Sequence, residues 1–260
     1  MWARRGRAGA NPGPAMDLPR IIGHRGAAAH APENTLASLD RAAALGAAWV
    51  EFDVKLTADN HCILFHDDTL ERTTNGHGPV AATTYDEISR LDAGSWFGPE
   101  FAGEPVPRLD TALDQVLDLD LHAEIEIKPC PGREVETAEA VMAEVSRCWP
   151  RGRPPLIASF EAECLAVARA AAPEWPRVLN CFRVPRDWRR QLEALDCRIL
   201  ACLYQRLTQR NVARMTTAGI TVVAFTVNEP DRAAELLEWG VSTIVTDAPE
   251  VIMPIAVEAA

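Results

Sequence analysis

A histidine and an arginine stand side by side where a short apolar segment ends. In IIGHRGAAAHAPENT, residues 21–35, two isoleucines precede His24 and Arg25, and a glycine flanks the pair on either side. A second histidine, His66, follows another apolar run in CILFHDD. Near neutral pH one imidazole can accept a proton while another donates one, and a guanidinium binds an oxyanion through paired donors. We therefore predict that His24 and His66 form an acid–base pair that acts on an anionic ester.

Carboxylates recur at alternate positions of two apolar segments. Glu51 and Asp53 lie two residues apart in WVEFDVKLT, and Glu124, Glu126 and Lys128 alternate in HAEIEIKP. Alternate residues of a strand share a face, and like charges gathered on one face repel unless a cation separates them. All-oxygen ligands suit a hard ion, and no histidine–cysteine set favours zinc. We predict one divalent metal ion held by Glu51, Asp53 and Glu126, with Mg²⁺ favoured and Ca²⁺ or Mn²⁺ as alternatives.

The charges of these residues indicate the kind of substrate. Three carboxylates, one divalent ion, Arg25 and Lys128 together leave one net positive charge, which a monoanionic phosphodiester would neutralise. Arginine offers paired planar donors to phosphate, and lysine offers a movable point charge. The chain has only two lysines, Lys55 and Lys128, so a lysine at a strand end is notable in a sequence dominated by arginine. We predict that Arg25 and Lys128 bind the phosphate.

These residues must be positioned by a repeating pattern of elements. Short runs rich in Val and Ile alternate with Ala- and Leu-rich segments of helical period, which favours βα units around a parallel sheet. The predicted strands cover 20–23, 48–54, 122–127, 156–160, 177–181, 198–203, 220–226 and 242–246. The predicted helices cover 34–45, 109–118, 134–148, 161–171, 186–195, 208–218 and 230–238. Eight strands in this length favour a closed (β/α)8 TIM barrel over an open doubly wound sheet, with the chemistry at the carboxyl ends of the strands.

One pair of strands cannot belong to this repeat. Only ADN and His61 separate the second strand from CILFHDD, which leaves no room for a crossover helix and predicts an antiparallel hairpin. A turn centred on Asp59 and Asn60 places Asp53 opposite His66, on the same face. This pairing depends on the length of the loop, because a shift of one residue reverses the face.

Three further segments lie outside the regular repeat. The stretch 67–108, rich in Gly, Thr and Pro, is predicted as an inserted region after the hairpin, with too little apolar periodicity for a core of its own. It is either a lid over the barrel mouth or a long loop fixed by its aromatic residues. Residues 1–19 are expected to be a disordered leader, with Met16 as an alternative start, and 252–260 a C-terminal tail; the catalytic domain spans 20–251.

Composition excludes several classes of protein. The chain has 260 residues, 48% hydrophobic and 24% charged, with a net charge of −11. This charge argues against a nucleic-acid partner, and no apolar run is long enough to span a membrane. The seven cysteines form no CxxC pair, and no signal peptide is evident, so we expect a reducing, cytoplasmic location. The partner is expected to be a small molecule, and no feature indicates an oligomeric state.

Segments along most of the chain resemble successive motifs of a known family. In order they are GHRGAAAHAPENT, EFDVKL, LFHDDTLERTTNG, DAGSWF, EIEIKP, ASF, FTVN and VTDAPE. They are similar to the glycerophosphodiester phosphodiesterases, most of all to the cytoplasmic bacterial branch. The resemblance implies a (β/α)8 barrel with a small insertion, a divalent metal, and hydrolysis of glycerophosphodiesters to sn-glycerol 3-phosphate and an alcohol. Position by position it implies His24 and His66 as the acid–base pair, Glu51, Asp53 and Glu126 as metal ligands, and Arg25 and Lys128 at the phosphate.

One position departs from the family pattern. Where the family often has tryptophan before TVN, this chain has Phe225, which keeps an apolar wall at the substrate but lacks the indole N–H. The preferred alcohol is therefore open. The attacking oxygen is also open, since either water or the 2-hydroxyl of the substrate could attack, the latter through a cyclic phosphate.

Two other functions compete with this interpretation. Enolase-type barrels also place acids at strand ends and use a lysine base on carboxylate substrates, but they need no histidine opposite Asp53. A non-catalytic barrel that binds phospholipid headgroups could dispense with His24, His66 or an acid, and all are present. Of the three functions, only the phosphodiesterase activity needs both histidines and all of the acids.

Overall fold

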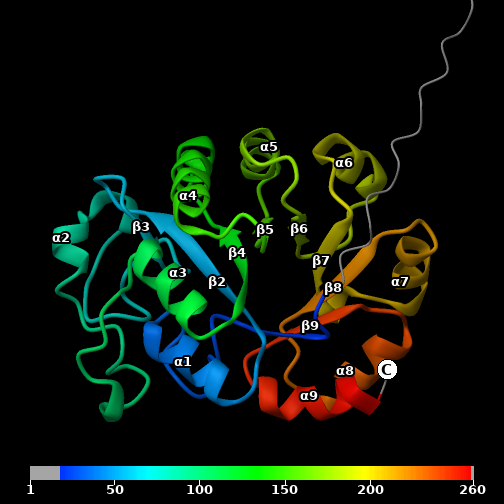
Figure 1. Cartoon of the computed structure of the whole chain (residues 1–260), viewed down its shortest axis with the longest axis horizontal. Helices are drawn as coiled ribbons and strands as arrows, with labels where there is room; N and C mark the ends of the chain where they lie inside the picture. Colours follow the sequence, from blue (N-terminus) through cyan, green and yellow to red (C-terminus); the bar gives the residue numbers. More distant parts are fainter. Residues whose placement is uncertain (1–17, 259–260) are drawn as a thin grey trace, which may run out of the picture.

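The computed structural model describes residues 18–258 and shows strands surrounded by helices (Figure 1). Nearly all of the predicted leader, 1–19, lies outside the described residues. The strands are β1 (Ile21–Gly23), β2 (Trp49–Leu56), β3 (Cys62–Leu64), β4 (His122–Ile127), β5 (Leu156–Ser159), β6 (Arg177–Cys181), β7 (Ile199–Leu203), β8 (Thr221–Phe225) and β9 (Thr243–Thr246). Each of the eight predicted strands is confirmed within a few residues at its ends.

The sheet closes on itself. Parallel pairing runs from β2 through β4 to β9, and β9 pairs with β1 through Ile21 and Ile244. Gly23 of β1 then pairs with Val50 of β2, which joins the two ends of the series. Within residues 18–258, eight parallel strands thus form the predicted (β/α)8 barrel, and β3 lies antiparallel to β2 outside it.

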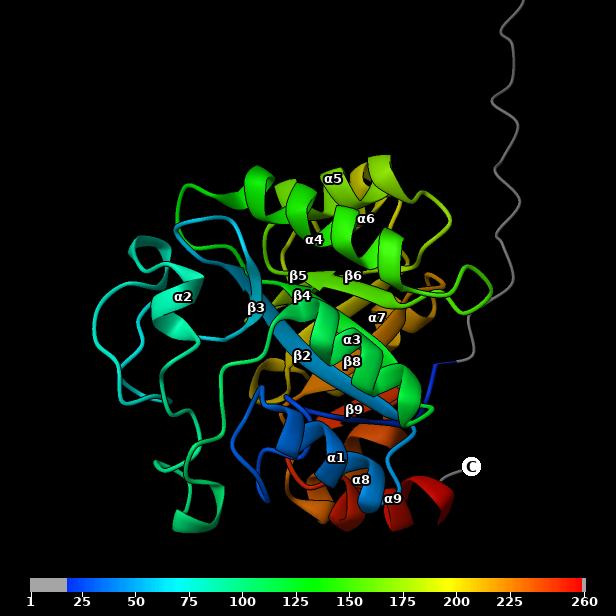
Figure 2. The ribbon, with the colours of Figure 1, turned by 60° about the vertical axis from the view of Figure 1, so that its left-hand side comes forward.

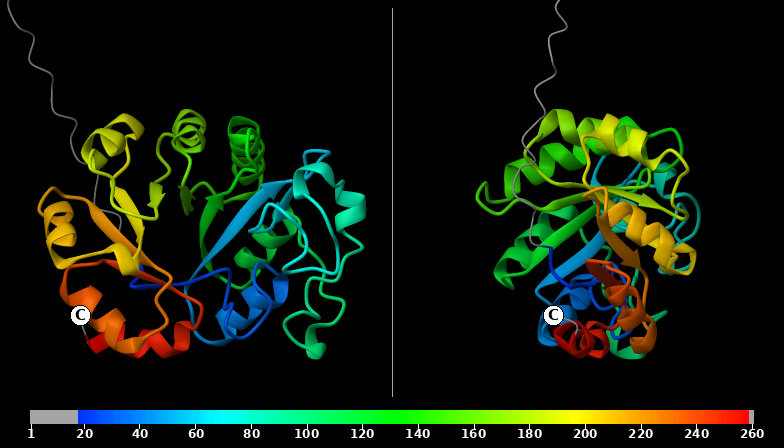
Figure 3. Two further views of the ribbon diagram at one scale, coloured as in Figure 1. Left: turned by 180° about the vertical axis from the view of Figure 1, so that it is seen from behind. Right: turned by 90° about the vertical axis from the view of Figure 1, so that its right-hand side faces the viewer.

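Helices cover the outside of this barrel (Figure 3). They are α1 (Leu36–Ala44), α3 (Leu109–Asp118), α4 (Glu134–Cys148), α5 (Ala162–Ala171), α6 (Trp188–Leu195), α7 (Gln209–Thr216), α8 (Pro230–Glu238) and α9 (Pro249–Glu258). The motif that begins at β1 also starts α1, because the Thr35 hydroxyl accepts the Ser38 N–H at 3.2 Å. The seven predicted helices are confirmed.

The predicted C-terminal tail, 252–260, is wrong over most of its described part. Helix α9 continues to Glu258, and its Ile252 and Ala256 are buried against the barrel. The physical reason is that β9, like each other barrel strand, has an apolar outer face that needs a covering helix.

Side chains alternate between the interior of the barrel and the helices. Phe52, Val54, Ile125 and Ile127 pack in the core between the strands and the helices α1, α3 and α4. The residues between them, which include the predicted acids, therefore point into the barrel. Apolar side chains such as Ile22 and Val223 fill the rest of the interior.

The hairpin forms as predicted, but its predicted register is wrong by one residue. Val54 pairs with Leu64, and the Phe65 N–H donates to the Asp53 carbonyl at 3.0 Å, so Phe65 and not His66 lies opposite Asp53. The reason is a three-residue loop in which Asn60 has a φ of 63°, a left-handed conformation that asparagine tolerates. Because β3 ends at Leu64, the alternation stops there and does not dictate the side on which His66 lies.

The insertion, 67–108, lies beside β3 at one side of the barrel and contains α2 (Tyr85–Ile88) (Figure 2). Contrary to the sequence expectation, it forms a small core. Leu70, Val80 and Ile88 pack with Ile63 and Phe65 of the hairpin. The sequence pattern did not reveal this core because its apolar residues are scattered through the insertion and need Ile63 and Phe65 of the hairpin to complete the cluster. No helix of the described residues is long and apolar enough to cross a membrane.

Candidate active site

A cavity of about 350 Å³ opens at the carboxyl ends of the barrel strands. Its lining includes all eight predicted site residues: His24, Arg25, Glu51, Asp53, His66, Glu126, Lys128 and Phe225. They come from the strands β2, β4 and β8 and from the segments that follow β1, β3 and β4. Parallel strands deliver their last residues to one face of a barrel, so residues distant in sequence meet there.

Three buried carboxylates converge in this cavity. Glu51, Asp53 and Glu126 each offer one oxygen so that the three oxygens lie within 4.8 Å of one another. Asp53 and Glu126 are direct partners in the pairing of β2 with β4. Their oxygen donors are those that Mg²⁺, Ca²⁺ and Mn²⁺ prefer. The donor set therefore fits one hard divalent ion.

The pKa values show how strongly this cluster needs a cation. Burial raises the pKa of Glu51 well above its usual range, and the Asp53 and Glu126 charges raise it further. Burial and the Asp53 charge raise the pKa of Glu126 to about 7, although Lys128 opposes them. Burial acts in the same direction on Asp53, but Arg25 and Lys128 outweigh it and hold the pKa of Asp53 well below its usual range. One carboxylate is thus ionised, and the other two tend to keep protons unless a further cation is bound.

Arg25 reaches this cluster through an uncommon backbone conformation. With a φ of 50° it directs its N–H to Glu51 Oε2 at 3.0 Å, while its Nε lies 3.2 Å from Asp53 Oδ2. The next residue, Gly26, has a φ of 89°, and a Cβ there would lie 2.4 Å from Ser38 Oγ. The glycine after the arginine is therefore required by both conformation and space.

Lys128 approaches the same carboxylates from β4. Its Nζ lies 2.7 Å from Glu126 Oε1 and 3.4 Å from Asp53 Oδ1. The ammonium also lies 5.2 Å from the centre of the Phe160 ring. Arg25 and Lys128 thus place two cations beside the carboxylates, where a singly charged phosphate group could bind.

Each of the two histidines is held by an aspartate through the same ring nitrogen. His24 Nδ1 lies 2.6 Å from Asp247 Oδ1, and His66 Nδ1 lies 2.6 Å from Asp67 Oδ1. An ionised aspartate at Nδ1 favours a proton on that nitrogen, which leaves Nε2 free in the neutral ring. His24 Nε2 lies 4.0 Å from Glu51 Oε2, so this nitrogen faces the carboxylate cluster.

The environment also keeps His66 neutral. Burial lowers the pKa of His66, the charge of Asp53 opposes this, and Arg25 and Lys128 lower it again. A ring with a lowered pKa is uncharged at neutral pH and can accept a proton.

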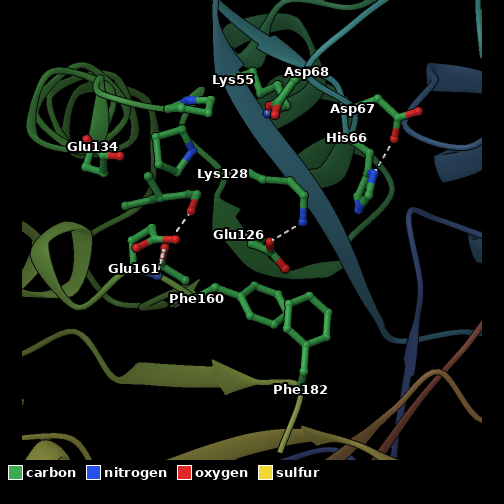
Figure 4. A pocket seen from close by; sticks show the side chains of 14 residues that line it. Lys55, His66, Asp67, Asp68, Glu126, Lys128, Glu134, Phe160, Glu161 and Phe182 are labelled. Carbon is green, nitrogen blue, oxygen red and sulfur yellow. Dashed lines mark hydrogen bonds and ion pairs between the residues drawn. The ribbon is translucent and has the colours of Figure 1, made fainter.

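A second, larger cavity of about 520 Å³ adjoins the first (Figure 4). The two share His66, Glu126 and Lys128 in their linings. Phe160 stacks on Phe182 with ring centres 4.6 Å apart, and its other ring neighbour, Phe225, lies 5.9 Å away. A substrate bound at Lys128 could therefore extend in two directions along an aromatic wall.

Comparison with known proteins agrees with this geometry. The model of the glycerophosphoryl diester phosphodiesterase family matches residues 24–251. The chain belongs to this family. A glycerophosphodiester phosphodiesterase of Caldanaerobacter subterraneus is 34% identical over 90% of this chain and 96% of its own. One of Bacillus subtilis is 32% identical over 88% of this chain and 83% of its own.

Solved structures extend the likeness to three dimensions. A phosphodiesterase of Oleispira antarctica, in complex with its product sn-glycerol-3-phosphate, superposes with a TM-score of 0.90 at 38% identity. It covers 93% of this chain and 97% of its own. A glycerophosphodiester phosphodiesterase of Agrobacterium tumefaciens gives a TM-score of 0.75 at 29% identity, over 91% of this chain and all of its own. The protein is thus an enzyme of the phosphodiesterase family and not an enolase-type barrel or a non-catalytic one.

The sequence analysis missed the residues that support the site in this phosphodiesterase. They are Asp67 and Asp247 at the histidines, Asn228 at Asp247, Asn34 at Asp53, and Asn180, whose Nδ2 donates to Glu126 Oε2 at 3.0 Å. Asp67 follows His66 in the chain, and Asp247 and Asn228 stand in motifs that carry the resemblance, so a signal was present for these. Asn180 lies in an ordinary strand sequence and gave none.

Proposed function

We propose that this enzyme hydrolyses glycerophosphodiesters to sn-glycerol 3-phosphate and an alcohol. The observation that carries the proposal is the convergence of three carboxylates, two cations and two aspartate-held histidines in one cavity. The product bound to the Oleispira antarctica enzyme supports the choice of substrate. With one divalent ion bound, the three carboxylates, Arg25 and Lys128 carry one net positive charge, which a monoanionic phosphodiester neutralises.

On this proposal Glu51, Asp53 and Glu126 hold one divalent metal ion, with Mg²⁺ favoured and Ca²⁺ or Mn²⁺ as alternatives. When bound, such an ion supplies positive charge that polarises a phosphoryl oxygen and stabilises the charge of the transition state. Asn34 and Asn180 fix two of the carboxylates, because they donate to Asp53 Oδ2 at 2.9 Å and to Glu126 Oε2 at 3.0 Å. Fixed ligands need little rearrangement when the site is loaded.

The remaining residues bind the substrate and move protons. Arg25 and Lys128 orient the phosphate, and the Phe225 ring provides an apolar wall beside it. One of His24 and His66 accepts a proton at Nε2 from the attacking oxygen, and the other donates one to the leaving alkoxide. The aspartates at Nδ1 keep both rings in the tautomer that this exchange requires.

The experiment is an assay for sn-glycerol 3-phosphate with glycerophosphocholine and glycerophosphoethanolamine, with and without EDTA. We expect product from at least one substrate, its loss with EDTA, and recovery with Mg²⁺, Mn²⁺ or Ca²⁺. Binding of the diesters without cleavage at any metal concentration would contradict the proposal. A transient cyclic glycerol phosphate in ³¹P NMR would indicate attack by the substrate 2-hydroxyl. Hydrolysis of that cyclic phosphate also takes up oxygen from water, so direct attack by water is indicated by ¹⁸O incorporation with no cyclic phosphate at any time point.

We further propose a cytoplasmic location and a role in glycerol and lipid metabolism. All seven cysteines are free, as suits a reducing compartment, and glycerophosphodiesters are deacylated phospholipids. Fractionation of the source cells tests the location. In the same proposal residues 67–108 form the rim of a single catalytic domain, which includes helix α9.

A further inference from the structure

Arg72, in the insertion, joins two carboxylates from different segments. Its Nε donates to Asp67 Oδ2 at 2.6 Å, and its Nη2 donates to Asp67 Oδ1 at 2.9 Å. The other edge of the guanidinium contacts Glu33, with Nη1 at 2.7 Å from Oε2 and Nη2 at 2.8 Å from Oε1. Arg72 therefore holds two carboxylates in bidentate pairs with one planar group.

Both of these carboxylates lead to the active site. Asp67 contacts His66 Nδ1, and Glu33 accepts a hydrogen bond from Arg25 Nη1. Arg25 in turn contacts Asp53. A continuous chain of hydrogen bonds thus runs from His66 through Asp67, Arg72 and Glu33 to Arg25.

Arg72 has no direct part in the site. It lines neither of the two cavities described above, and its side chain is 44% exposed. Any effect it has on the reaction must pass through the groups that it holds. Simple stabilisation of the surface is a weak explanation, because an exposed ion pair contributes little and needs no bidentate contact on two sides.

We propose that Arg72 is a positioning residue, which fixes Asp67 and thereby the ring orientation and tautomer of His66. The proposal rests on the proposed role of His66 in catalysis. Through Arg72 the insertion becomes part of the catalytic apparatus, since the same guanidinium also holds the segment after β1 by way of Glu33. Lysine could not replace it, because an ammonium lacks the planar fork that satisfies both carboxylates.

The test compares Arg72→Ala and Arg72→Lys with the wild-type protein. We expect Arg72→Ala to lower kcat by about 10- to 100-fold with a smaller change in KM, since the ring is misplaced and the metal site is intact. Arg72→Lys should recover only a small part of the loss. Because the side chain is exposed, millimolar methylguanidinium should reach the gap in Arg72→Ala and restore part of kcat.

A second measurement does not depend on activity. In ¹⁵N NMR of the metal-free protein at neutral pH, the His66 ring should show a protonated Nδ1 and an unprotonated Nε2 in the wild type, and a mixture of tautomers in Arg72→Ala. The matched control is Arg90→Ala, which removes another arginine of the insertion; within residues 18–258 its ion-pair partner is Asp86 alone, at the surface. This control should leave kcat and the His66 signals unchanged.

The outcomes are separable. An unchanged His66 tautomer and an unchanged kcat in a folded Arg72→Ala variant would overturn the proposal. If the wild-type protein releases no sn-glycerol 3-phosphate, the proposed function fails, and the NMR comparison alone decides whether Arg72 positions His66. If Arg72→Ala does not fold, Arg72→Lys carries the same two measurements, and wild-type behaviour in that variant would overturn the proposal.

Discussion

The two histidines of the site are held in the same way by different parts of the molecule. His24 is held by Asp247, which follows β9 and is itself held by Asn228 Nδ2 at 2.7 Å. His66 is held by Asp67, next to it in sequence, and Asp67 is held by Arg72. The first support belongs to the barrel, and the second belongs to the insertion.

The barrel fold fixes the support of His24 but not the support of His66. The barrel strands set the distance between β1 and β9, so the support of His24 follows from the closed sheet. The segment after β3 has no strand to hold it, so His66 depends on local contacts and on one arginine that bridges two segments. We expect the His66 support to be the more easily disturbed of the two.

The largest effect should come from removing either histidine. His24→Ala and His66→Ala should each lower kcat by about 10²- to 10⁴-fold, because general acid–base catalysis contributes that much. Calorimetric titration with Mn²⁺ should still show binding to both variants. His77→Ala, which changes an exposed histidine of the insertion, is the control. Full turnover by either site variant would contradict the acid–base roles.

The supporting aspartates should show a smaller, unequal effect. We expect Asp247→Asn and Asp67→Asn each to lower kcat by about 10- to 100-fold, with the larger loss in Asp67→Asn. An amide at either position must turn its N–H₂ toward one of the donors that the carboxylate accepts. At 247 these donors are His24 and the neutral amide of Asn228, whereas at 67 they include the charged guanidinium of Arg72, so the loss should be larger at 67. Steady-state kinetics with one diester measures the ratio. A larger loss in Asp247→Asn would reverse the comparison.

The pH titration of His66 should move in a definite direction. The hydrogen bond to Asp67 raises the pKa of His66, against the lowering by burial. Its removal in Asp67→Asn should therefore move the His66 midpoint to lower pH, as measured by NMR titration of the metal-free protein. Asp247→Asn should leave the His66 midpoint in place, and an upward shift in Asp67→Asn would refute the assigned contact.

The smallest effect concerns stability in acid. Hydrogen bonds from Arg72 lower the pKa of Asp67. They also lower the pKa of Glu33, although burial acts in the opposite direction on that carboxyl group. Both groups release protons more readily when folded, so their contribution to stability is present above about pH 5 and is lost as the pH falls through their folded pKa values. The difference between Arg72→Ala and the wild type should therefore be largest at pH 6 and should narrow, without vanishing, by pH 3.

Urea unfolding at these pH values measures the difference. We expect about 1 kcal/mol or less at pH 6, because Arg72 is partly exposed and solvent screens its charge. Arg90→Ala, which removes an exposed surface pair, should show no such narrowing. A difference that grows toward acid pH would contradict the sign of the linkage.

Local pattern was enough to predict most of the fold. The alternation in WVEFDVKLT and HAEIEIKP predicted that Glu51, Asp53 and Glu126 lie on one face of their strands. Alternate side chains of a strand point to opposite faces, so the apolar residues face the helices and the acids face the interior of the barrel. The sequence also places a glycine on either side of His24 and Arg25, and the second of these, Gly26, is required by the backbone turn there. These features depend only on neighbours in the chain.

The sequence by itself therefore determined the barrel, its closed strand series and the eight residues around the cavity. Only the tertiary structure decided the hairpin register, the small core of the insertion and the helix α9, since each depends on contacts between segments distant in sequence. The same is true of the supports at the two histidines. Asp247 reaches His24 across 223 positions, and Arg72 reaches Glu33 across 39, and no local periodicity records contacts of that range.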